Sequence, residues 1–205
     1  MREDQKVNFR PSYICPGMKA VTRIDWATGE VLACQIGRNE LLAIDACNSI
    51  ANAEELYFKE AHDGNPAQQY TSIISSSAGK HDGLHWHAPE EEASSPPGRL
   101  SEFPKGAVAE ITPDKPPVFD RYGFRILTAQ GEKAKGGAKS YIVNGKLNGG
   151  FAVLAVSVKY RDSGITSFLI SQEGVVYQKD LGANTLDVAA AIKEYNPTDG
   201  WTPAE

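Results

Sequence analysis

The part of the sequence that decides the fold is a series of short apolar runs, YGFRILTA at residues 122–129, KSYIV at 139–143, FAVLAVSVKY at 151–160, ITSFLIS at 165–171 and VVYQ at 175–178. Their short period and apolar, β-branched and aromatic content are typical of strands. Turn residues separate the runs, including a flexible turn at Gly131–Gly137 and the hairpin dipeptide Asn144-Gly145. The almost continuously apolar run at 151–160 indicates a central strand that is covered on both faces. The sequence therefore predicts an antiparallel meander sheet.

A long helix is predicted before this sheet, over residues 39–61. Asn39 can act as its N-cap, with the Glu40 carboxylate in the first turn, where it suits the helix dipole. The apolar residues of this helix recur at spacings of three and four and form one stripe, made of Leu42, Ala46, Ile50, Ala53, Tyr57 and Ala61. The cluster Asp63–Pro66 then ends the helix, with Gly64 as its left-handed C′ residue.

A short helix is predicted to follow the last strand. Asn184 or Thr185 can cap it, and Val188, Ile192 and Tyr195 share one face. The dipeptide Asn196-Pro197 then stops it. With both helices on one side of the sheet, the predicted class is α+β, a long N-terminal helix packed on an antiparallel meander sheet and closed by a short C-terminal helix.

The rest of the chain is irregular in pattern. We expect an irregular segment at residues 1–21 and a single α+β domain at 22–205, which opens with a hairpin over Thr22–Cys34. Gln68–Ile74 is compatible with one helical turn. Residues 88–117 are a Pro-rich loop region, because closely spaced prolines prevent long regular elements.

Charge and hydropathy exclude several partner classes. The formal net charge is −5, so the surface repels phosphate backbones, and no nucleic-acid partner is expected. No run of about 18 apolar residues occurs, so no membrane span is expected. The polar start at residues 1–6 shows no secretory leader, and taken literally this predicts a cytoplasmic protein.

The three cysteines are Cys15, Cys34 and Cys47. Their spacing matches neither a zinc or redox pair nor a disulfide framework. Cys47 lies in the helical stripe and is expected to be a small buried hydrophobe. A Cys15–Cys34 disulfide would form only in an oxidising compartment.

The sharpest chemical pattern is HDGLHWH at residues 81–87, which is followed by three glutamates. In an extended chain His85 and His87 point to the same face, as a transition-metal site requires, and His81 or Glu90 could supply a third ligand. Histidines in loops usually bind nothing, and this spacing matches no known metal motif. A metal site at His81, His85, His87 and Glu90 is therefore a hypothesis to be weighed against plain loop residues.

No catalytic or cofactor-binding signature is present. Ser75–Ser77 near His81 and Asp82 contains the residue types of a hydrolytic triad but lacks the Gly-x-Ser-x-Gly elbow. Gly131–Gly137 resembles a phosphate loop, but Gly137 takes the place of its lysine and a strand follows where a helix is needed. We expect no catalytic residue and no cofactor.

Several strings together resemble a known bacterial family. They are IGRNEL at 36–41, GKHDGLHW at 79–86, SPPG at 95–98, YGFRILTAQG at 122–131 and VVYQKDLG at 175–182. From about Thr22 to Trp201 the chain resembles the bacterial family called domain of unknown function 2950. The resemblance brings no catalytic residue with it.

The resemblance implies an exported envelope or periplasmic protein. Typical members begin with a secretion signal and a further N-terminal region, so we expect this chain to correspond to the C-terminal part of one. The position of His85 is usually tyrosine in the family pattern, and His87 is not part of it, which weakens the metal hypothesis. The architecture and the pattern Gly164, Thr166 or Ser167, Phe168, Gly174 and Val176 also resemble, more distantly, the heads of pilins and pseudopilins.

Two functional hypotheses follow. The leading one is a non-enzymatic exported envelope protein that acts as an interaction or scaffolding module, through the 88–117 region or an exposed sheet face. The competing one is a small-ligand or metal-binding protein, or a hydrolase, with its site in the His81–Glu92 loop. A pocket with convergent histidine and carboxylate groups would favour the second, and a flat apolar patch on the sheet the first. The residues identify neither the partner nor the oligomeric state.

Overall fold

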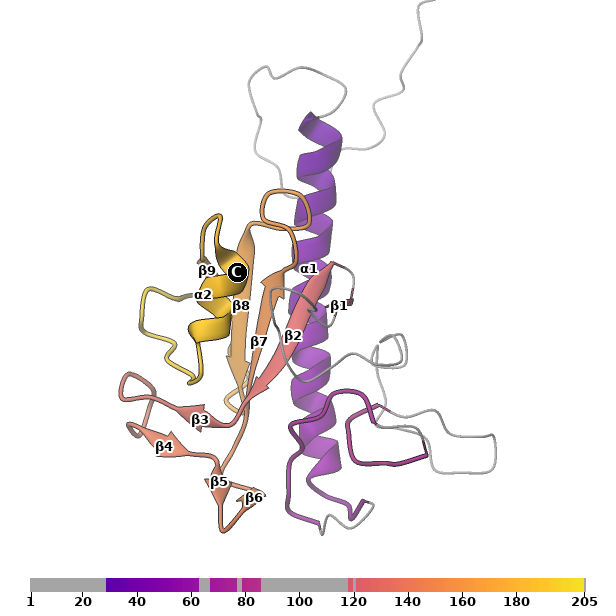
Figure 1. Ribbon diagram of the computed structural model, residues 1–205, viewed down its shortest axis with the longest axis vertical. Coiled ribbons are helices and arrows are strands. Elements are labelled where there is room, and N and C mark those ends of the chain that lie inside the picture. The colour runs from indigo at the N-terminus through magenta and orange to yellow at the C-terminus, as the bar shows by residue number, and fades with distance from the viewer. Residues whose placement is uncertain (1–28, 63–66, 77–78, 86–117, 120, 205) are drawn as a thin grey trace, which may run out of the picture.

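The computed structural model describes residues 29–62, 67–76, 79–85, 118–119 and 121–204. One long helix, α1 (Gly29–Tyr57), lies along an antiparallel sheet (Figure 1). A short helix, α2 (Thr185–Ala191), follows close to the C-terminus of the chain. This arrangement confirms the predicted α+β class. Among the helices of the described residues, none is long and apolar enough to cross a membrane.

The main sheet has six strands in the order β1-β2-β7-β8-β9-β10, all paired antiparallel. The strands are β1 (Val118–Phe119), β2 (Tyr122–Leu127), β7 (Ala152–Ser157), β8 (Thr166–Ser171), β9 (Tyr177–Asp180) and β10 (Thr202–Pro203). The meander is therefore confirmed from β7 onward. All six residues of β7 are buried, as the continuous apolar run predicts.

Between β2 and β7 the chain leaves the main sheet. It forms two small sheets, β3 (Ala129–Gln130) with β4 (Lys139–Ser140), and β5 (Ile142–Val143) with β6 (Lys146–Leu147). The predicted strand at 139–143 is thus wrong, because it divides at Tyr141. The Tyr141 ring is fully buried, and its N–H donates to the carbonyl of Thr128 at 2.8 Å.

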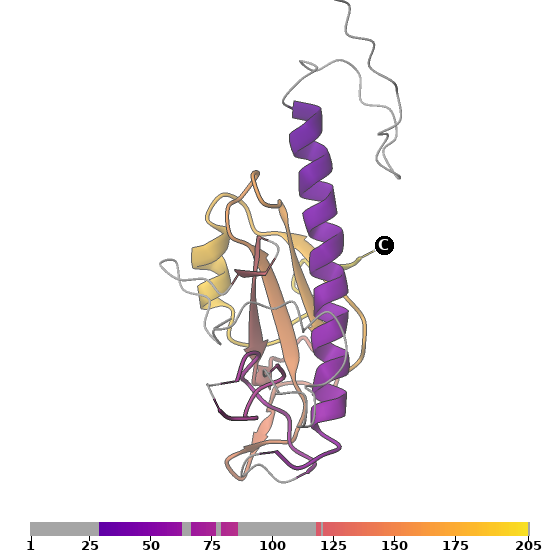
Figure 2. The same cartoon turned by 90° about the vertical axis from the view of Figure 1, so that its right-hand side faces the viewer.

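The two helices lie on opposite faces of the sheet (Figure 2). Paired residues in the β2–β7 and β7–β8 ladders place Tyr122, Phe124 and Phe168 on one face, and the rings of Tyr122 and Phe168 are 5.9 Å apart. Arg125 faces the other side and donates to the carbonyl of Ala189 in α2 at 2.8 Å. The prediction that both helices share one side is therefore wrong. Each helix covers the apolar residues of one face.

Helix α1 begins ten residues earlier than predicted, so the strand predicted at Glu30–Cys34 is wrong. Considered without the residues that follow, the apolar run within Glu30–Cys34 is compatible with a strand. The buried positions Ile36, Asn39 and Ala43 instead extend the core-facing stripe at spacings of three and four. The helix ends at Tyr57, and Gly64, its predicted C′ residue, lies outside the described residues, as does the first half of the predicted hairpin.

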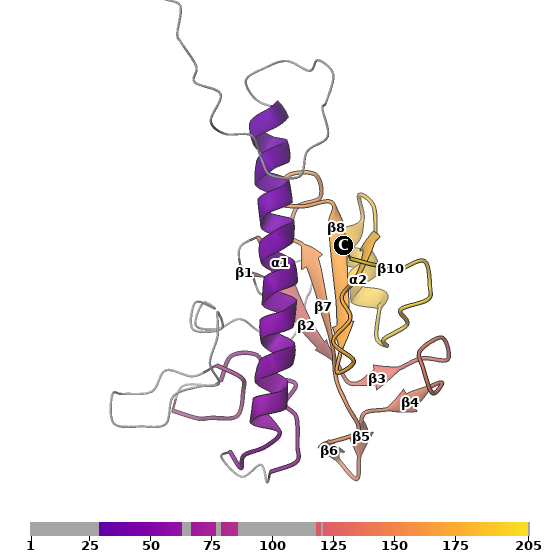
Figure 3. The same ribbon diagram turned by 180° about the vertical axis from the view of Figure 1, so that it is seen from behind.

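Asn39 is therefore an interior helix residue rather than an N-cap. Its side-chain amide donates to the carbonyl of Ser163 at 2.8 Å, and Glu40 Oε1 accepts the N–H groups of Ile165 (2.9 Å) and Thr166 (3.0 Å). The two side chains attach the middle of α1 to the turn before β8, where the helix runs alongside β7 and β8 (Figure 3). These contacts fix the register of the helix on the sheet.

Helix α2 also differs from its prediction. It begins at Thr185 after Asn184, as expected, but it buries Thr185 and Ala189 and leaves Val188 exposed. It ends before Tyr195, whose N–H donates to the carbonyl of Ala129 at 3.0 Å. Tyr195 thus belongs to a pairing with β3, which the 3.6-residue period could not reveal.

The turn at 131–137 is more structured than the predicted flexible turn. The Gln130 side-chain amide donates to the carbonyls of Lys135 (2.8 Å) and Gly137 (2.7 Å), and its oxygen accepts the Tyr141 hydroxyl. Ala134 is buried within the turn. The glycines of this segment therefore belong to an ordered turn that is held by side-chain hydrogen bonds.

Candidate functional site

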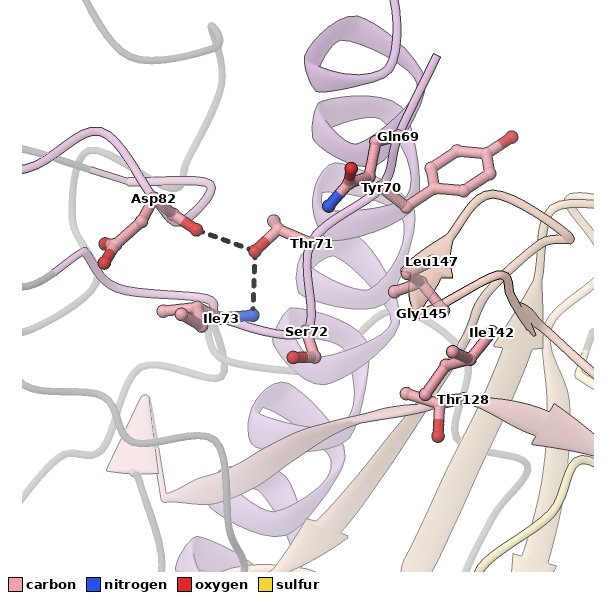
Figure 4. Close-up of a pocket in the computed structure, with 10 residues that line it drawn as sticks. All are labelled: Gln69, Tyr70, Thr71, Ser72, Ile73, Asp82, Thr128, Ile142, Gly145 and Leu147. Carbon is pink, nitrogen blue, oxygen red and sulfur yellow. Dashed lines mark hydrogen bonds between the residues drawn. The ribbon is translucent and has the colours of Figure 1, made fainter. Parts of the chain in front are cut away.

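The candidate site is a pocket near the C-terminal end of α1, between residues 69–73 and the β5–β6 hairpin (Figure 4). Its volume is about 230 Å³. We call it the hairpin pocket; it is lined by Gln69, Tyr70, Thr71, Ser72, Ile73, Asp82, Thr128, Ile142, Gly145 and Leu147. The lining combines hydroxyl and amide groups with the apolar side chains of the hairpin.

The wall formed by residues 69–73 is irregular and contains no helix, so the helical turn predicted at Gln68–Ile74 is wrong. Its main-chain donors bind other parts of the fold. The Tyr70 N–H donates to the carbonyl of Leu147 at 2.7 Å, and the Thr71 N–H donates to Glu54 Oε2 at 3.1 Å. The Tyr70 ring lies 4.4 Å from that of Phe58. These tertiary contacts outweigh a weak local preference for helix.

Thr71 also connects this wall to the loop that carries the HDGLHW string (residues 81–86, of which the structure describes 81–85), here called the HDGLHW loop. Its hydroxyl donates to the carbonyl of Asp82 at 2.8 Å and accepts the N–H of Ile73 at 3.1 Å (Figure 4). The loop then returns alongside residues 73–76, and the Leu84 N–H donates to the carbonyl of Ile73 at 3.0 Å. A Cβ at Gly83 would lie 2.8 Å from the carbonyl oxygen of Ile73, so this approach requires glycine.

Glu54 of α1 lies behind Thr71 and is fully buried. Burial raises the pKa of its carboxyl well above the ordinary value, the Thr71 N–H opposes this, and the nearby Glu55 carboxylate raises the pKa further. Oε1 has no hydrogen-bond partner. Sequence reasoning missed this residue, although a glutamate beside the apolar stripe at Ala53 and Tyr57 was a visible signal.

The predicted metal ligands are only partly described. His81 and His85 lie in the loop, where the His81 carbonyl accepts the Tyr57 hydroxyl at 3.4 Å, and neither histidine lines the hairpin pocket. His87 and Glu90 lie outside the described residues. Within the residues that are described, no group of three or more His, Cys, Asp or Glu side chains could hold a metal ion.

The serines of the same region have structural contacts. The Ser76 hydroxyl accepts the N–H of Gly83 at 2.8 Å, and the Ser76 N–H donates to the carbonyl of His85 at 2.8 Å. Ser77 lies outside the described residues. These contacts hold the loop and show no activated nucleophile at Ser76.

Comparison with known proteins places the chain in a family. A family model described as "Protein of unknown function (DUF2950)" matches residues 22–204. The chain belongs to this family. No curated protein and no solved structure matches it, so the likeness to pilin heads stays a prediction.

This DUF2950 chain leaves one large apolar side chain exposed in the lining of the hairpin pocket, and the next residue, which is outside the lining, is exposed too. Ile142 is 47% exposed and Val143 is 44% exposed, both on β5. The turn that follows has positive φ at Asn144 (53°) and Gly145 (75°), as the dipeptide predicts. The missed signal was the Ile-Val pair directly before that turn.

The cysteines of this DUF2950 chain differ in environment. Cys47 is a fully buried free thiol whose pKa is raised by burial, as expected of a core residue. Cys34 is disulfide-bonded. Cys15, the partner considered from the sequence, lies outside the described residues.

Proposed function

We propose that this DUF2950 protein is a non-enzymatic, exported bacterial envelope protein that acts as an interaction or scaffolding module. The observation that carries the proposal is the exposed side chain of Ile142 in the lining of the hairpin pocket, with exposed Val143 next to it in β5. Large apolar side chains that remain exposed next to a concave surface are typical of protein contact sites. The central strands offer no such patch, because α1 and α2 cover their two faces.

The size of the hairpin pocket supports a protein partner. Small-molecule sites usually measure roughly 300–1,000 Å³, whereas this pocket has about 230 Å³. That volume suits one or two side chains of a partner, and Thr71, Ser72 and Asp82 offer them polar contacts. The 88–117 region, the other surface considered, lies outside the described residues.

Two observations support export. Cys34 is disulfide-bonded, and disulfides persist in oxidising compartments such as the periplasm. The family resemblance also implies an envelope or periplasmic location. The long helix across an antiparallel sheet supports the pilin-head likeness as an analogy of architecture, which carries no function.

Replacing Ile142 and Val143 together by serine should abolish capture of the partner from bacterial envelope extract. The double variant removes the apolar contact area, while both positions are exposed, so we expect stability to change by less than about 0.5 kcal/mol. The measurement is a pull-down with the 205-residue chain as bait, followed by quantification of each captured protein.

The matched control is Val175→Ser. Val175 is 42% exposed but lies outside the hairpin pocket, so this variant should capture the partner at the wild-type level. Equal capture by all three proteins, or no protein enriched by the wild type, would contradict the proposed surface.

The second candidate is a small-ligand or metal-binding protein, or a hydrolase, that uses the His81–Glu92 loop. Its support is that Asp82 of this loop lines the hairpin pocket together with hydroxyl-bearing residues. If the loop binds a transition metal, Zn²⁺ titration of the chain should show saturable binding, and His85→Ala should weaken the affinity at least tenfold, because one imidazole ligand is lost. Unchanged affinity in the variant would rule out the site.

A further inference from the structure

A buried acid lies behind the hairpin pocket and has no role in the proposed contact. Glu54 is 0% exposed, and its Oε2 accepts the Thr71 N–H at 3.1 Å while Oε1 is unpaired. A buried unpaired carboxyl oxygen costs free energy, and an ionised one would cost more. The arrangement is thus most stable with Glu54 protonated.

Glu54 also anchors a small network. Thr71, which it holds through the main chain, binds Asp82 and Ile73 through its hydroxyl. Residues 73–76 and 83–85 then pair, with the His85 N–H donating to the carbonyl of Ile74 at 2.9 Å. We call residues 70–76 and 83–85 the paired segment. It carries Thr71 and Ser72 of the pocket wall, and Asp82, another residue of that wall, directly precedes its second part.

We propose that the Glu54–Thr71 contact is a pH-sensitive latch that holds the paired segment against α1 and thereby keeps the hairpin pocket in shape. The latch is closed while Glu54 is protonated. Ionisation favours an open state, in which the paired segment separates from α1 and water reaches the carboxylate. As a means of regulating the pocket, the latch rests on the proposed function.

The net effect of the groups around Glu54 is to favour its neutral form. Burial is the largest influence, and the Glu55 carboxylate beside it on α1 acts in the same direction. From the paired segment, the main-chain N–H of Thr71 favours the ionised form. The Tyr70 hydroxyl, 3.4 Å from Glu55 Oε1, is a titratable group of that segment near the two acids, and its pKa is raised to about 12, so it stays neutral.

The direction in which pH changes the opening equilibrium follows from the difference in the pKa of Glu54 between the closed and open states. The closed state has the raised pKa, and the open state has the ordinary value of 4.5. Opening is therefore unaffected by pH below 4.5 and becomes about tenfold more favourable per pH unit above it, because the open state releases a proton. The rise stops at the pKa of the closed state.

Hydrogen exchange of the free protein between pH 5 and 7 tests the latch. Intrinsic exchange rises about tenfold per pH unit, so a pH-independent opening gives a slope of one in log rate against pH. For the amides of Thr71, Ile73, Leu84 and His85 we expect a slope of about two in the wild type, up to the pH at which Glu54 ionises in the closed state, since opening adds a second factor of ten below that pH. Glu54→Gln, which cannot ionise, should reduce the slope to about one.

Glu55→Gln is the matched control, because it removes the neighbouring acid but leaves Glu54 able to ionise. It should keep a slope of about two. A slope of one over the whole range from pH 5 to 7 in the wild type overturns the latch without any variant, even if Glu54→Gln does not fold. The latch is also overturned if β7 and β8 amides share the opening free energy of the paired segment, because Glu54 would then act on global unfolding. No partner is present, so the result is independent of the capture experiment.

Discussion

Gly164→Ala should lower the free energy of unfolding by about 3 kcal/mol, a large effect for one added methyl group. A Cβ at this position would collide with the Tyr122 hydroxyl and lie 2.7 Å and 2.9 Å from ring atoms Cζ and Cε2. The Tyr122 ring cannot move away, because it is fully buried and its hydroxyl donates to the carbonyl of Thr166 at 2.8 Å. Urea denaturation of wild type and variant measures the difference.

Gly37→Ala is the matched control for this substitution. Gly37 lies inside α1, and a Cβ there would meet no atom within 4 Å. Alanine should raise the stability by about 1 kcal/mol, because it favours the helix without a new contact. A Gly164→Ala protein as stable as the wild type would show that the turn before β8 can shift away from Tyr122.

The sequence predicted those elements whose cause is local. The apolar run at 151–160 forms a strand that is buried on both faces, and Asn144-Gly145 forms a hairpin turn. The strand requires only a continuous apolar run, and the turn requires only two residues that tolerate positive φ. Ala46, Ile50, Ala53 and Tyr57 are buried as the helical stripe requires, since the 3.6-residue period is also local.

The wrong predictions concern residues whose hydrogen-bond partners are distant in the sequence. Asn39 has the chemistry of an N-cap, but its amide binds Ser163, 124 residues away. Tyr195 continues the apolar period of α2, but its main chain pairs with β3. In each case the residue type was interpreted correctly as a hydrogen-bonding or apolar group, and only the position of its partner was unavailable from the pattern.

The candidate site was predicted only in part for the same reason. The HDGLHW loop was identified as notable, and its Asp82 lines the hairpin pocket. The other wall comes from β5 and β6, about 60 residues later in the sequence. No spacing rule connects Asp82 with Ile142, so their proximity could emerge only from the tertiary structure.

The strings that carry the family resemblance coincide with structural contacts. IGRNEL contains Asn39 and Glu40, which attach α1 to the turn before β8. YGFRILTAQG contains Gln130, which organises the 131–137 turn, and Arg125, which lies beneath α2. These residues account for the fold of this chain more directly than for any chemistry. Arg125 is the strongest case, because a buried cation needs a specific partner.

Arg125→Met should lower the free energy of unfolding by about 3 kcal/mol, because carbonyl groups of α2 lose a charged donor and stay buried. The guanidinium, on a residue that is 7% exposed, donates to the carbonyls of Ala189 and Ile192, where the helix dipole is negative. Urea denaturation measures the loss, and faster hydrogen exchange in α2 would locate it. The control is Arg121→Met, four residues earlier, whose exposed side chain makes an ion pair of 3.9 Å with Asp162 and should contribute less than about 0.5 kcal/mol. Equal losses in the two variants would show that α2 does not depend on this cation.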